Sequence, residues 1–226
     1  QVIAEGAEIG IAFDGDGDRL IAVGASGALI DGDHIMAIAA VDLAHRGLLR
    51  NKGVAVTVMT NLGFHHTMRD NNIDVVITPV GDRSILVALD EFDFVLGGEQ
   101  SGHVIHRAHA TTGDGLLAAL QLVEYITRSG VTLDQAASIM QSYPQILVNI
   151  RTLNRVHDPV HDIAEQISQA EAELGDNGRI LVRSSGTEPL VRVMVEAADQ
   201  VTAESIAMRL AQSLVDIHGG SIEGTH

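Results

Sequence analysis

The chain has 226 residues, of which 46% are hydrophobic and 19% are charged, and it contains no cysteine and no tryptophan. This length suits one large domain or two smaller ones with a buried core, and the apolar fraction excludes a disordered chain. The absence of cysteine excludes a disulfide framework, a thiolate nucleophile and a cysteine-ligated zinc site.

The chain is strongly acidic, because 30 Asp and Glu against 14 Lys and Arg give a formal charge of −16. Such a surface repels nucleic acid and anionic membranes, so we expect neither as a partner. No apolar run is long enough to span a membrane, and residues 1–5 lack the basic start of a signal peptide, so we expect a cytoplasmic protein. An anionic substrate would need a local cluster of arginines or a metal-binding loop.

Strands and helices alternate along residues 1–143. Short apolar runs predict strands at Ile9–Phe13 and Leu20–Gly24, on either side of an acidic turn. A helix follows, with Asp33 as its possible N-cap. The remaining predicted strands and helices are at 54–60, 74–80 and 94–96, and at 33–46, 63–71, 114–129 and 133–142. Apolar strands between helices favour a covered sheet, so the predicted fold class is α/β with mixed α/β sandwich domains.

The C-terminal part has a different order of elements. A strand at Gln145–Arg151 is followed by a helix at 158–174, two strands at 178–183 and Leu190–Ala197, and a helix at 202–218. This β-α-β-β-α order predicts a smaller α+β domain after a boundary near Tyr143.

The densest polar motif is Asp-Gly-Asp-Gly-Asp-Arg at 14–19. In an extended segment Asp14, Asp16 and Asp18 point to one side, and a hard divalent cation such as Mg²⁺ relieves the repulsion among their carboxylates. A calcium EF-hand needs Gly at its sixth position and Glu at its twelfth, where this loop has Arg19 and Ala25. A solvated acidic turn is the other alternative. The motif predicts an Mg²⁺ loop between two strands.

A second polar loop, Arg-Ser-Ser-Gly-Thr-Glu-Pro at 183–189, lies between two predicted strands and is followed by Arg192. Arginine side chains, hydroxyl groups and a glycine amide together can surround a phosphate dianion. The loop lacks the Gly-Lys-Ser/Thr of a P-loop, and a polar hairpin turn with incidental arginines is the alternative. We interpret it as a phosphate-binding loop.

A third loop, Gly-Gly-Glu-Gln-Ser-Gly-His at 97–103, follows a short predicted strand. Its mix of donors and acceptors suits the hydroxyls of a sugar, and His103 could transfer a proton near neutral pH. We interpret His106 and His109 as packing or surface histidines rather than zinc ligands, because no acidic or cysteine partner is near in sequence. Arg83, at another strand end, could face a ligand or pair with Asp82.

The three loops, in this order and at these separations, resemble those of the α-D-phosphohexomutase family, and the resemblance covers nearly the whole chain. Family members have four domains around one cleft, with a phosphoserine in the first, an Mg²⁺ loop in the second, a sugar loop in the third and a phosphate loop in the fourth. The sequences at 98–103 and 80–83 look most like those of bacterial members that interconvert glucosamine 6-phosphate and glucosamine 1-phosphate.

The resemblance implies a role for each motif residue. Asp14, Asp16 and Asp18 would bind Mg²⁺, Arg19 would steady the phosphate of the phosphoserine, and His103 would be a proton-transfer candidate beside the sugar. The substrate-binding positions would be Glu99 and Ser101 at the sugar hydroxyls, Arg183, Ser185, Gly186, Thr187 and Arg192 at the phosphate that does not react, and Arg83 as a further candidate.

The family's catalytic serine lies in a Ser-x-His-Asn type loop well upstream of the metal loop, and this chain has no such sequence. We therefore expect a C-terminal fragment that does not turn over sugar phosphates alone. Its parts would be the end of the second domain (1–28), the third domain (29–143) and the fourth domain (144–226). Its partners would be a hexosamine phosphate substrate and the missing N-terminal domains of the parent mutase. Gln100, between Glu99 and Ser101, favours an amino sugar. A phosphomannomutase or phosphoglucomutase, or a non-catalytic module that binds a sugar phosphate, are the alternatives.

Overall fold

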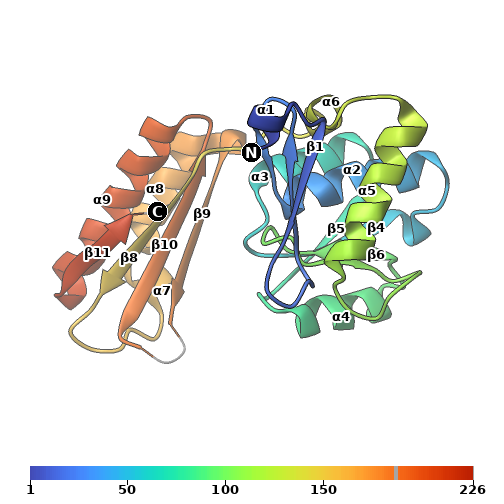
Figure 1. Cartoon of the computed structure of the whole chain (residues 1–226). Helices are drawn as coiled ribbons and strands as arrows, with labels where there is room; N and C mark the ends of the chain where they lie inside the picture. Colours follow the sequence, from blue (N-terminus) through green and yellow to red (C-terminus); the bar gives the residue numbers. More distant parts are fainter. Residues whose placement is uncertain (186–187, 226) are drawn as a thin grey trace. The chain divides into compact units, whose positions relative to one another are not determined.

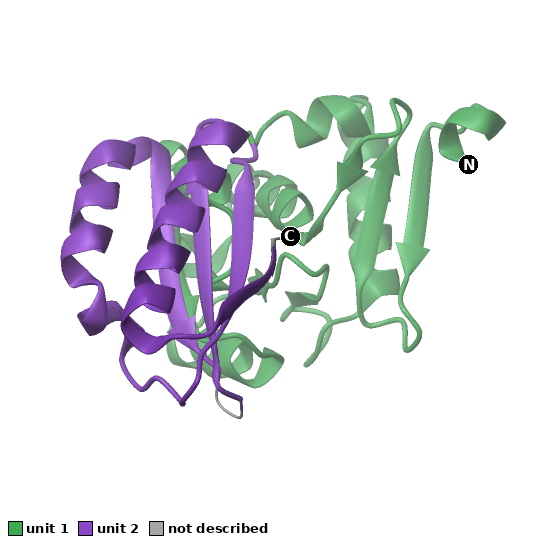
Figure 2. Cartoon of the chain, turned by 90° about the vertical axis from the view of Figure 1, so that its left-hand side faces the viewer, with its two compact units in different colours: residues 1–141 green, residues 142–226 purple. Residues whose placement is uncertain are grey.

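The computed structural model describes residues 1–185 and 188–225, which form two compact units, Gln1–Gln141 and Ser142–His226 (Figures 1 and 2). Among the described residues, unit 1 contains two sheets and unit 2 contains one, and each unit has its own buried core. Within the described residues, no helix combines the length and apolar character needed to cross a membrane.

The main sheet of unit 1 has the strand order β5-β4-β6-β7. β4 pairs in parallel with β5 and β6, and β7 runs antiparallel to β6. These strands are β4 (Gly53–Thr57), β5 (Asp74–Thr78), β6 (Leu96–Gly98) and β7 (Val104–His106). β-branched residues fill β4, which is buried along its whole length. A central parallel strand buried on both faces is typical of an α/β sandwich.

Helices cover both faces of this sheet. Val54, Val56 and Leu96 pack in the larger core of unit 1, whereas Ala55 and Ile105 pack in a separate cluster with α4. Figure 1 shows α4 on the opposite side of the sheet from α2. The helices of the larger core are α2 (Gly32–His45), α3 (Leu62–Asp70), α5 (Gly115–Ser129) and α6 (Leu133–Ala137), and α4 spans Asp82–Glu91.

A short antiparallel sheet precedes the α/β part of unit 1. It has the order β1-β2-β3, with β1 at Ile9–Phe13, β2 at Leu20–Gly24 and β3 at Leu29–Ile30, and it follows α1 (Val2–Glu5). Leu20 and Ala22 are fully buried in the larger core, so β2 is tied to the α/β part. Because β3 pairs with β2, strand pairing continues across residues 28 and 29. The division of unit 1 at this position stays a prediction.

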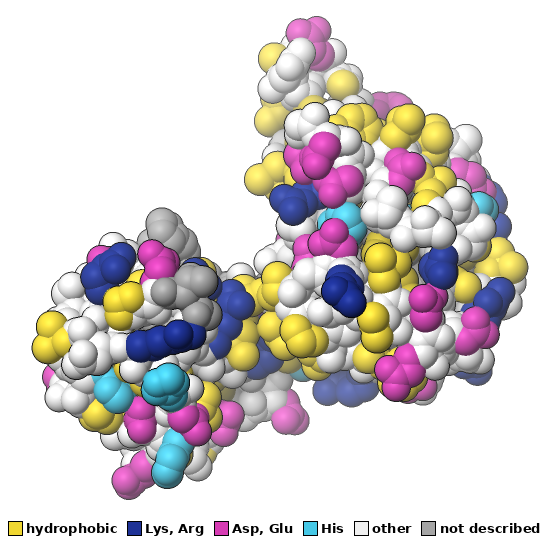
Figure 3. Space-filling model, turned by 90° about the horizontal axis from the view of Figure 1, so that it is seen from below, with side chains coloured by type: hydrophobic (Ala, Val, Ile, Leu, Met, Phe, Trp, Pro, Cys, Tyr) yellow, Lys and Arg dark blue, Asp and Glu magenta, His cyan; other side chains and the backbone are white. Residues whose placement is uncertain are grey.

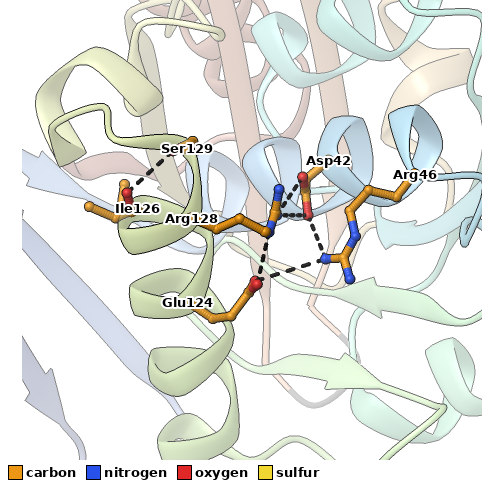
Figure 4. Close-up of polar contacts among 6 residues, drawn as sticks. All are labelled: Asp42, Arg46, Glu124, Ile126, Arg128 and Ser129. Carbon is orange, nitrogen blue, oxygen red and sulfur yellow. Dashed lines mark hydrogen bonds and ion pairs between the residues drawn. The ribbon is translucent and has the colours of Figure 1, made fainter.

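An ion-pair network joins α2 to α5 (Figure 4). Both carboxylate oxygens of Asp42 lie 2.7 Å from Nη2 of Arg128, and Oδ2 of Asp42 also pairs with Arg46 at 3.1 Å. Arg128 also donates to Glu124, one turn earlier on α5. Exposed pairs contribute little one by one, but the network joins α2, which contacts the 97–103 loop, to α5, which contacts the acidic loop.

Unit 2 is an antiparallel sheet with helices on one face. The strand order is β11-β8-β10-β9, and alternate residues Val191, Val193 and Val195 of β10 are buried against the helices. The strands are β8 (Gln145–Arg151), β9 (Gly178–Ser184), β10 (Leu190–Ala197) and β11 (Ser221–Thr225), and the helices are α7 (Pro159–Asp162), α8 (Ala164–Leu174) and α9 (Gln200–His218). This α+β unit after a mixed α/β unit confirms the predicted fold class.

Several elements differ from the sequence prediction. α2 is capped by Asp31, whose side chain accepts from the N–H of His34, and not by Asp33, which is buried inside the helix. The predicted helix at 158–174 breaks at Ile163, whose side chain is fully buried and whose backbone is not helical. α4 was not predicted, because Gly81 at its N-cap has no capping side chain. β7, β11 and the short helices η1 (Arg50–Lys52) and η2 (Gly175–Asn177) were also missed, and α6 is shorter than predicted.

His106 on β7 gives unit 1 a pH-dependent stability. Its side chain is 6% exposed, and burial, assisted by the charge of His109, lowers its pKa to about 4 from 6.5. The unfolded chain therefore takes up a proton between pH 6.5 and 4 that the folded chain does not. We expect His106 to reduce the free energy of unfolding by about 2 kcal/mol at pH 5 relative to pH 7, measured by urea denaturation.

The control for this prediction is the exposed neighbour His109. His106→Asn should flatten the fall in stability between pH 7 and 5, whereas His109→Asn should leave it close to that of the wild type. An unchanged slope in His106→Asn would show that burial does not hold this imidazole neutral.

Candidate functional site

The acidic loop is the turn of the β1–β2 hairpin. Asp14, Asp16 and Asp18 each offer a carboxylate oxygen, and these oxygens lie within 4.8 Å of one another. The hairpin register pairs Phe13 with Leu20, which brings the two ends of the loop together. The carbonyl of Gly17 accepts from the N–H of Gly115 at the start of α5, at 3.0 Å. The three carboxylates therefore lie on a loop that the hairpin pairing fixes at both ends and that a backbone hydrogen bond from Gly115 of α5 fixes at Gly17.

The carboxylates differ in their partners. Oδ2 of Asp18 lies 3.1 Å from Nδ1 of His103, while its Oδ1 is buried with no hydrogen-bond partner among the described residues. Asp14 accepts from the backbone N–H of Arg19 at 3.2 Å and pairs with its guanidinium at 3.7 Å. Desolvation raises the pKa of Asp14, but the backbone hydrogen bond from Arg19 together with the Arg19 charge leaves it below its usual value. An all-oxygen set with one buried, unpartnered oxygen fits a hard divalent cation.

His103 lies under the acidic loop. Its side chain is 2% exposed, its backbone bridges to Arg19, and a Cβ at Gly113 would overlap its ring. The sequence grouped His103 with the sugar-binding residues as a proton-transfer candidate. In the structure its ring contacts Asp18, so this residue orients a carboxylate of the acidic loop, and its role in proton transfer stays a prediction.

The third loop turns from β6 into β7 and lines an open pocket. Glu99 Oε1 accepts from the N–H of Gly81 at 3.0 Å, and the Ser101 hydroxyl donates to Glu99 Oε2 at 3.3 Å. The pocket has a volume of about 450 Å³, within the range of small-molecule sites. Its lining residues are Asp31, Thr57, Met59, Val80, Glu99, Gln100 and Ser101.

Two neighbouring segments fix this loop. The N–H of Leu20 on β2 donates to the carbonyl of Gly102, and the N–H of Gly32 on α2 donates to the carbonyl of Gln100, both at 3.0 Å. A Cβ at Gly32 would overlap the carbonyl oxygen of Glu99 and lie 2.7 Å from the amide nitrogen of Gly102. Only glycine lets the loop backbone approach α2 this closely.

Arg83 does not line the pocket of Glu99 and Ser101. It lies in the first turn of α4, exposed, beside a groove that also includes Val87 and Phe92. Its link to the sugar loop is indirect, through the Gly81–Glu99 hydrogen bond just before α4. Among the described residues, Arg83 makes no hydrogen bond or ion pair with another candidate residue of unit 1, and its role in substrate binding stays a prediction.

In unit 2, Arg183 and Arg192 are direct cross-strand partners on β9 and β10, and Asn149 on β8 stands opposite Arg192. Burial and then the charge of Arg192 lower the pKa of Arg183. No carboxylate of the described residues pairs with either guanidinium, an arrangement that favours an anion. Figure 3 shows several dark-blue arginine side chains on the part of unit 2 seen from below, with magenta and cyan side chains beside them.

Ser185 directly follows β9, the strand that carries Arg183. Its N–H donates to the carbonyl of Leu190 at 2.7 Å, and its hydroxyl accepts from the N–H of Glu188 at 3.4 Å. The two other predicted phosphate-loop residues, Gly186 and Thr187, lie outside the described residues.

Sequence reasoning missed Asp31, Thr57 and Met59 in the pocket of unit 1, and Asn149 beside the arginines of unit 2. The strand register between β8 and β10 would have indicated Asn149, because it lies in one row with Arg192 and Arg183. No local signal in the sequence connects Asp31 to a loop almost seventy residues away.

The chain matches two family models. Residues 31–143 match "Phosphoglucomutase/phosphomannomutase, alpha/beta/alpha domain III", and residues 147–213 match the C-terminal domain of the same family. The chain therefore belongs to the phosphoglucomutase/phosphomannomutase family, which confirms the predicted family.

The curated relatives are more specific. A phosphoglucosamine mutase of Clavibacter michiganensis subsp. michiganensis is 53% identical over 93% of this chain and 48% of the relative. A phosphoglucosamine mutase of Thermobifida fusca is 49% identical over 95% of this chain and 48% of the relative. The chain thus spans about half the length of the curated relatives it matches.

Solved structures show the same fold at low sequence identity. Aspergillus fumigatus N-acetylphosphoglucosamine mutase, in complex with GlcNAc-6P and magnesium, superposes with a TM-score of 0.75 at 24% identity over 93% of this chain and 49% of that chain. A phosphoglucomutase/phosphomannomutase family protein of Burkholderia thailandensis gives a TM-score of 0.75 at 23% identity over 98% and 49%.

Gly32→Ala tests the docking of the 97–103 loop onto α2. The new methyl group would overlap the Glu99 carbonyl, so we expect a net loss of about 2 kcal/mol in the free energy of unfolding and faster amide exchange at residues 99–102. Gly15→Ala is the control, because a Cβ there meets nothing within 4 Å. Equal stability of the two variants would contradict the tight docking.

Proposed function

We propose that this chain carries the metal, sugar and phosphate loops of a phosphoglucosamine mutase, which interconverts glucosamine 6-phosphate and glucosamine 1-phosphate. One observation carries the proposal: the three carboxylates of the acidic loop converge within 4.8 Å, on a hairpin hydrogen-bonded to the loop that presents Glu99 and Ser101. Curated relatives at 53% identity over 93% of the chain support the choice of enzyme.

Asp14, Asp16 and Asp18 would hold Mg²⁺, and the unpartnered Oδ1 of Asp18 supports this assignment. When bound, the ion supplies positive charge to a phosphoryl group in transfer. His103 keeps Asp18 oriented through its other oxygen, and the half-exposed guanidinium of Arg19 is available to a phosphate next to the loop.

The substrate would be bound through both its sugar hydroxyls and its phosphate. Glu99 and Ser101 would bind sugar hydroxyls, since Glu99 retains acceptor capacity beyond its bonds to Gly81 and Ser101. Arg183 and Arg192, with Ser185, Gly186, Thr187 and Asn149 nearby in sequence or register, would bind the phosphate that does not react. Arg83 would lie at the edge of this site and would contribute little to substrate binding.

The reaction needs a phosphoryl donor. A phosphoserine would transfer its phosphoryl group to one oxygen of the sugar phosphate, which gives a bisphosphate, and the second phosphoryl group of that intermediate would return to the serine. We propose that this serine belongs to domains of the parent mutase outside residues 1–226, because the chain matches about half of each relative. The residues of this chain would position the sugar and balance charge.

Removing one carboxylate tests the metal loop. Asp16→Asn should weaken Mg²⁺ or Mn²⁺ binding to the 226-residue chain by more than tenfold, measured by calorimetry, because a neutral amide oxygen is a poorer ligand for a hard cation. Asp176→Asn, an acidic residue of unit 2, should bind the ion as the wild type does. Equal binding by all three proteins would exclude the acidic loop as the metal site.

Sugar-phosphate binding tests the phosphate loop. Arg192→Gln should weaken binding of glucosamine 6-phosphate at least tenfold by loss of a charge-assisted hydrogen bond, measured by calorimetry. The control is Arg209→Gln, which removes an exposed arginine of α9 that pairs with Glu173. Tighter binding of glucose or mannose 6-phosphate than of glucosamine 6-phosphate would favour a phosphoglucomutase or phosphomannomutase, the activities for which the matched family is named.

A further inference from the structure

Asp31 faces the pocket in which we place the sugar. Its side chain is 31% exposed, and it lines the same open pocket as Glu99, Gln100 and Ser101. The residue is also the N-cap of α2, the helix onto which the sugar loop is docked through Gly32. Its position relative to the loop is therefore fixed by backbone contacts.

Hydrogen bonds hold the carboxylate of Asp31 in place. The backbone N–H of His34 donates to its Oδ1 at 3.1 Å, and Nδ1 of the His34 ring lies 2.8 Å from the same oxygen. Both contacts of His34 fall on Oδ1, and no hydrogen bond among the described residues reaches Oδ2, so that oxygen retains acceptor capacity.

The carboxylate of Asp31 is ionised at neutral pH. Burial by itself raises the pKa of this group, but the hydrogen bonds from His34 outweigh burial and leave the pKa below its usual value. The pocket thus contains two carboxylates, Asp31 and Glu99, and its lining residues in the described part of the chain include no lysine or arginine. We place Glu99 and Ser101 at neutral sugar hydroxyls. The second negative charge of the pocket, on Asp31, therefore favours a cationic group on the ligand.

A helix cap does not require this charge. Asn caps a helix about as well as Asp does, because the cap needs only a side-chain oxygen. Capping therefore does not account for the negative charge at residue 31, which lies beside the His34 ring and on the lining of the pocket.

We infer that Asp31 selects an amino sugar: its carboxylate accepts a hydrogen bond from the protonated amino group of the hexosamine phosphate bound in the pocket of Glu99 and Ser101. The inference rests on the proposed function and adds a specificity-determining residue to it. A neutral hydroxyl at the same ring position gains less from this carboxylate, since a charge-assisted hydrogen bond is the stronger one.

The test compares two sugar phosphates on one variant. Asp31→Asn keeps the size and the capping oxygen of the side chain and removes its charge. We expect the preference of the 226-residue chain for glucosamine 6-phosphate over glucose 6-phosphate, measured by calorimetry at pH 7, to fall about three- to tenfold in the variant. Binding of glucose 6-phosphate should change by less than about twofold.

Asp199→Asn is the matched control. Asp199 caps α9 in unit 2 through the N–H of Thr202, so this variant makes the same change at a helix start away from the pocket, and its sugar preference should equal that of the wild type. An unchanged preference in Asp31→Asn, with both sugars still bound by the wild type, would overturn the role of Asp31 alone. Failure of the wild-type chain to bind either sugar phosphate would overturn the proposed function and with it this inference.

Discussion

The structure of unit 1 depends on how closely the 97–103 loop approaches two neighbours. Backbone hydrogen bonds tie this loop to β2 through Leu20 and to α2 through Gly32, and glycine at positions 32 and 102 permits the approach. Because β2 also carries one end of the acidic loop, the two loops cannot move independently without breaking these bonds. A single backbone junction thereby sets the spacing between the candidate metal ligands and the candidate sugar ligands.

Charge is distributed unevenly over this acidic protein. The carboxylates of the 14–18 loop converge with one oxygen left unpartnered, and two arginines face each other across strands of unit 2. Both arrangements are unfavourable by themselves, since like charges close together repel. Each becomes favourable when a counter-charge binds, which is the usual electrostatic character of a phosphoryl-transfer enzyme.

Much of the fold could be predicted from the sequence. Apolar alternation located most strands, and the spacing of the three aspartates indicated their convergence, because neighbouring side chains of an extended loop alternate in direction. Local patterns could not indicate α4, which lacks a capping side chain, or the break at Ile163, which is set by burial in the core.

Sequence reasoning could not predict which residues of the candidate site come together from distant segments of the chain. His103 is the last residue of the 97–103 loop but contacts Asp18, eighty-five residues earlier. In the sequence, Asp31 is typical of a residue at a helix start. It lines the pocket only because the 97–103 loop docks onto that helix. Both positions follow from tertiary contacts, about which a residue's immediate neighbours carry no information.

The cross-strand pairing of Arg183 and Arg192 also couples the folding of unit 2 to anion binding. Repulsion between the two like charges lowers the stability of the β9–β10 ribbon, and an anion bound between them would remove that repulsion. Such an anion would raise the free energy of unfolding of unit 2 with the logarithm of its concentration once that exceeds the dissociation constant. The two strands would therefore unfold less readily with the anion bound than without it.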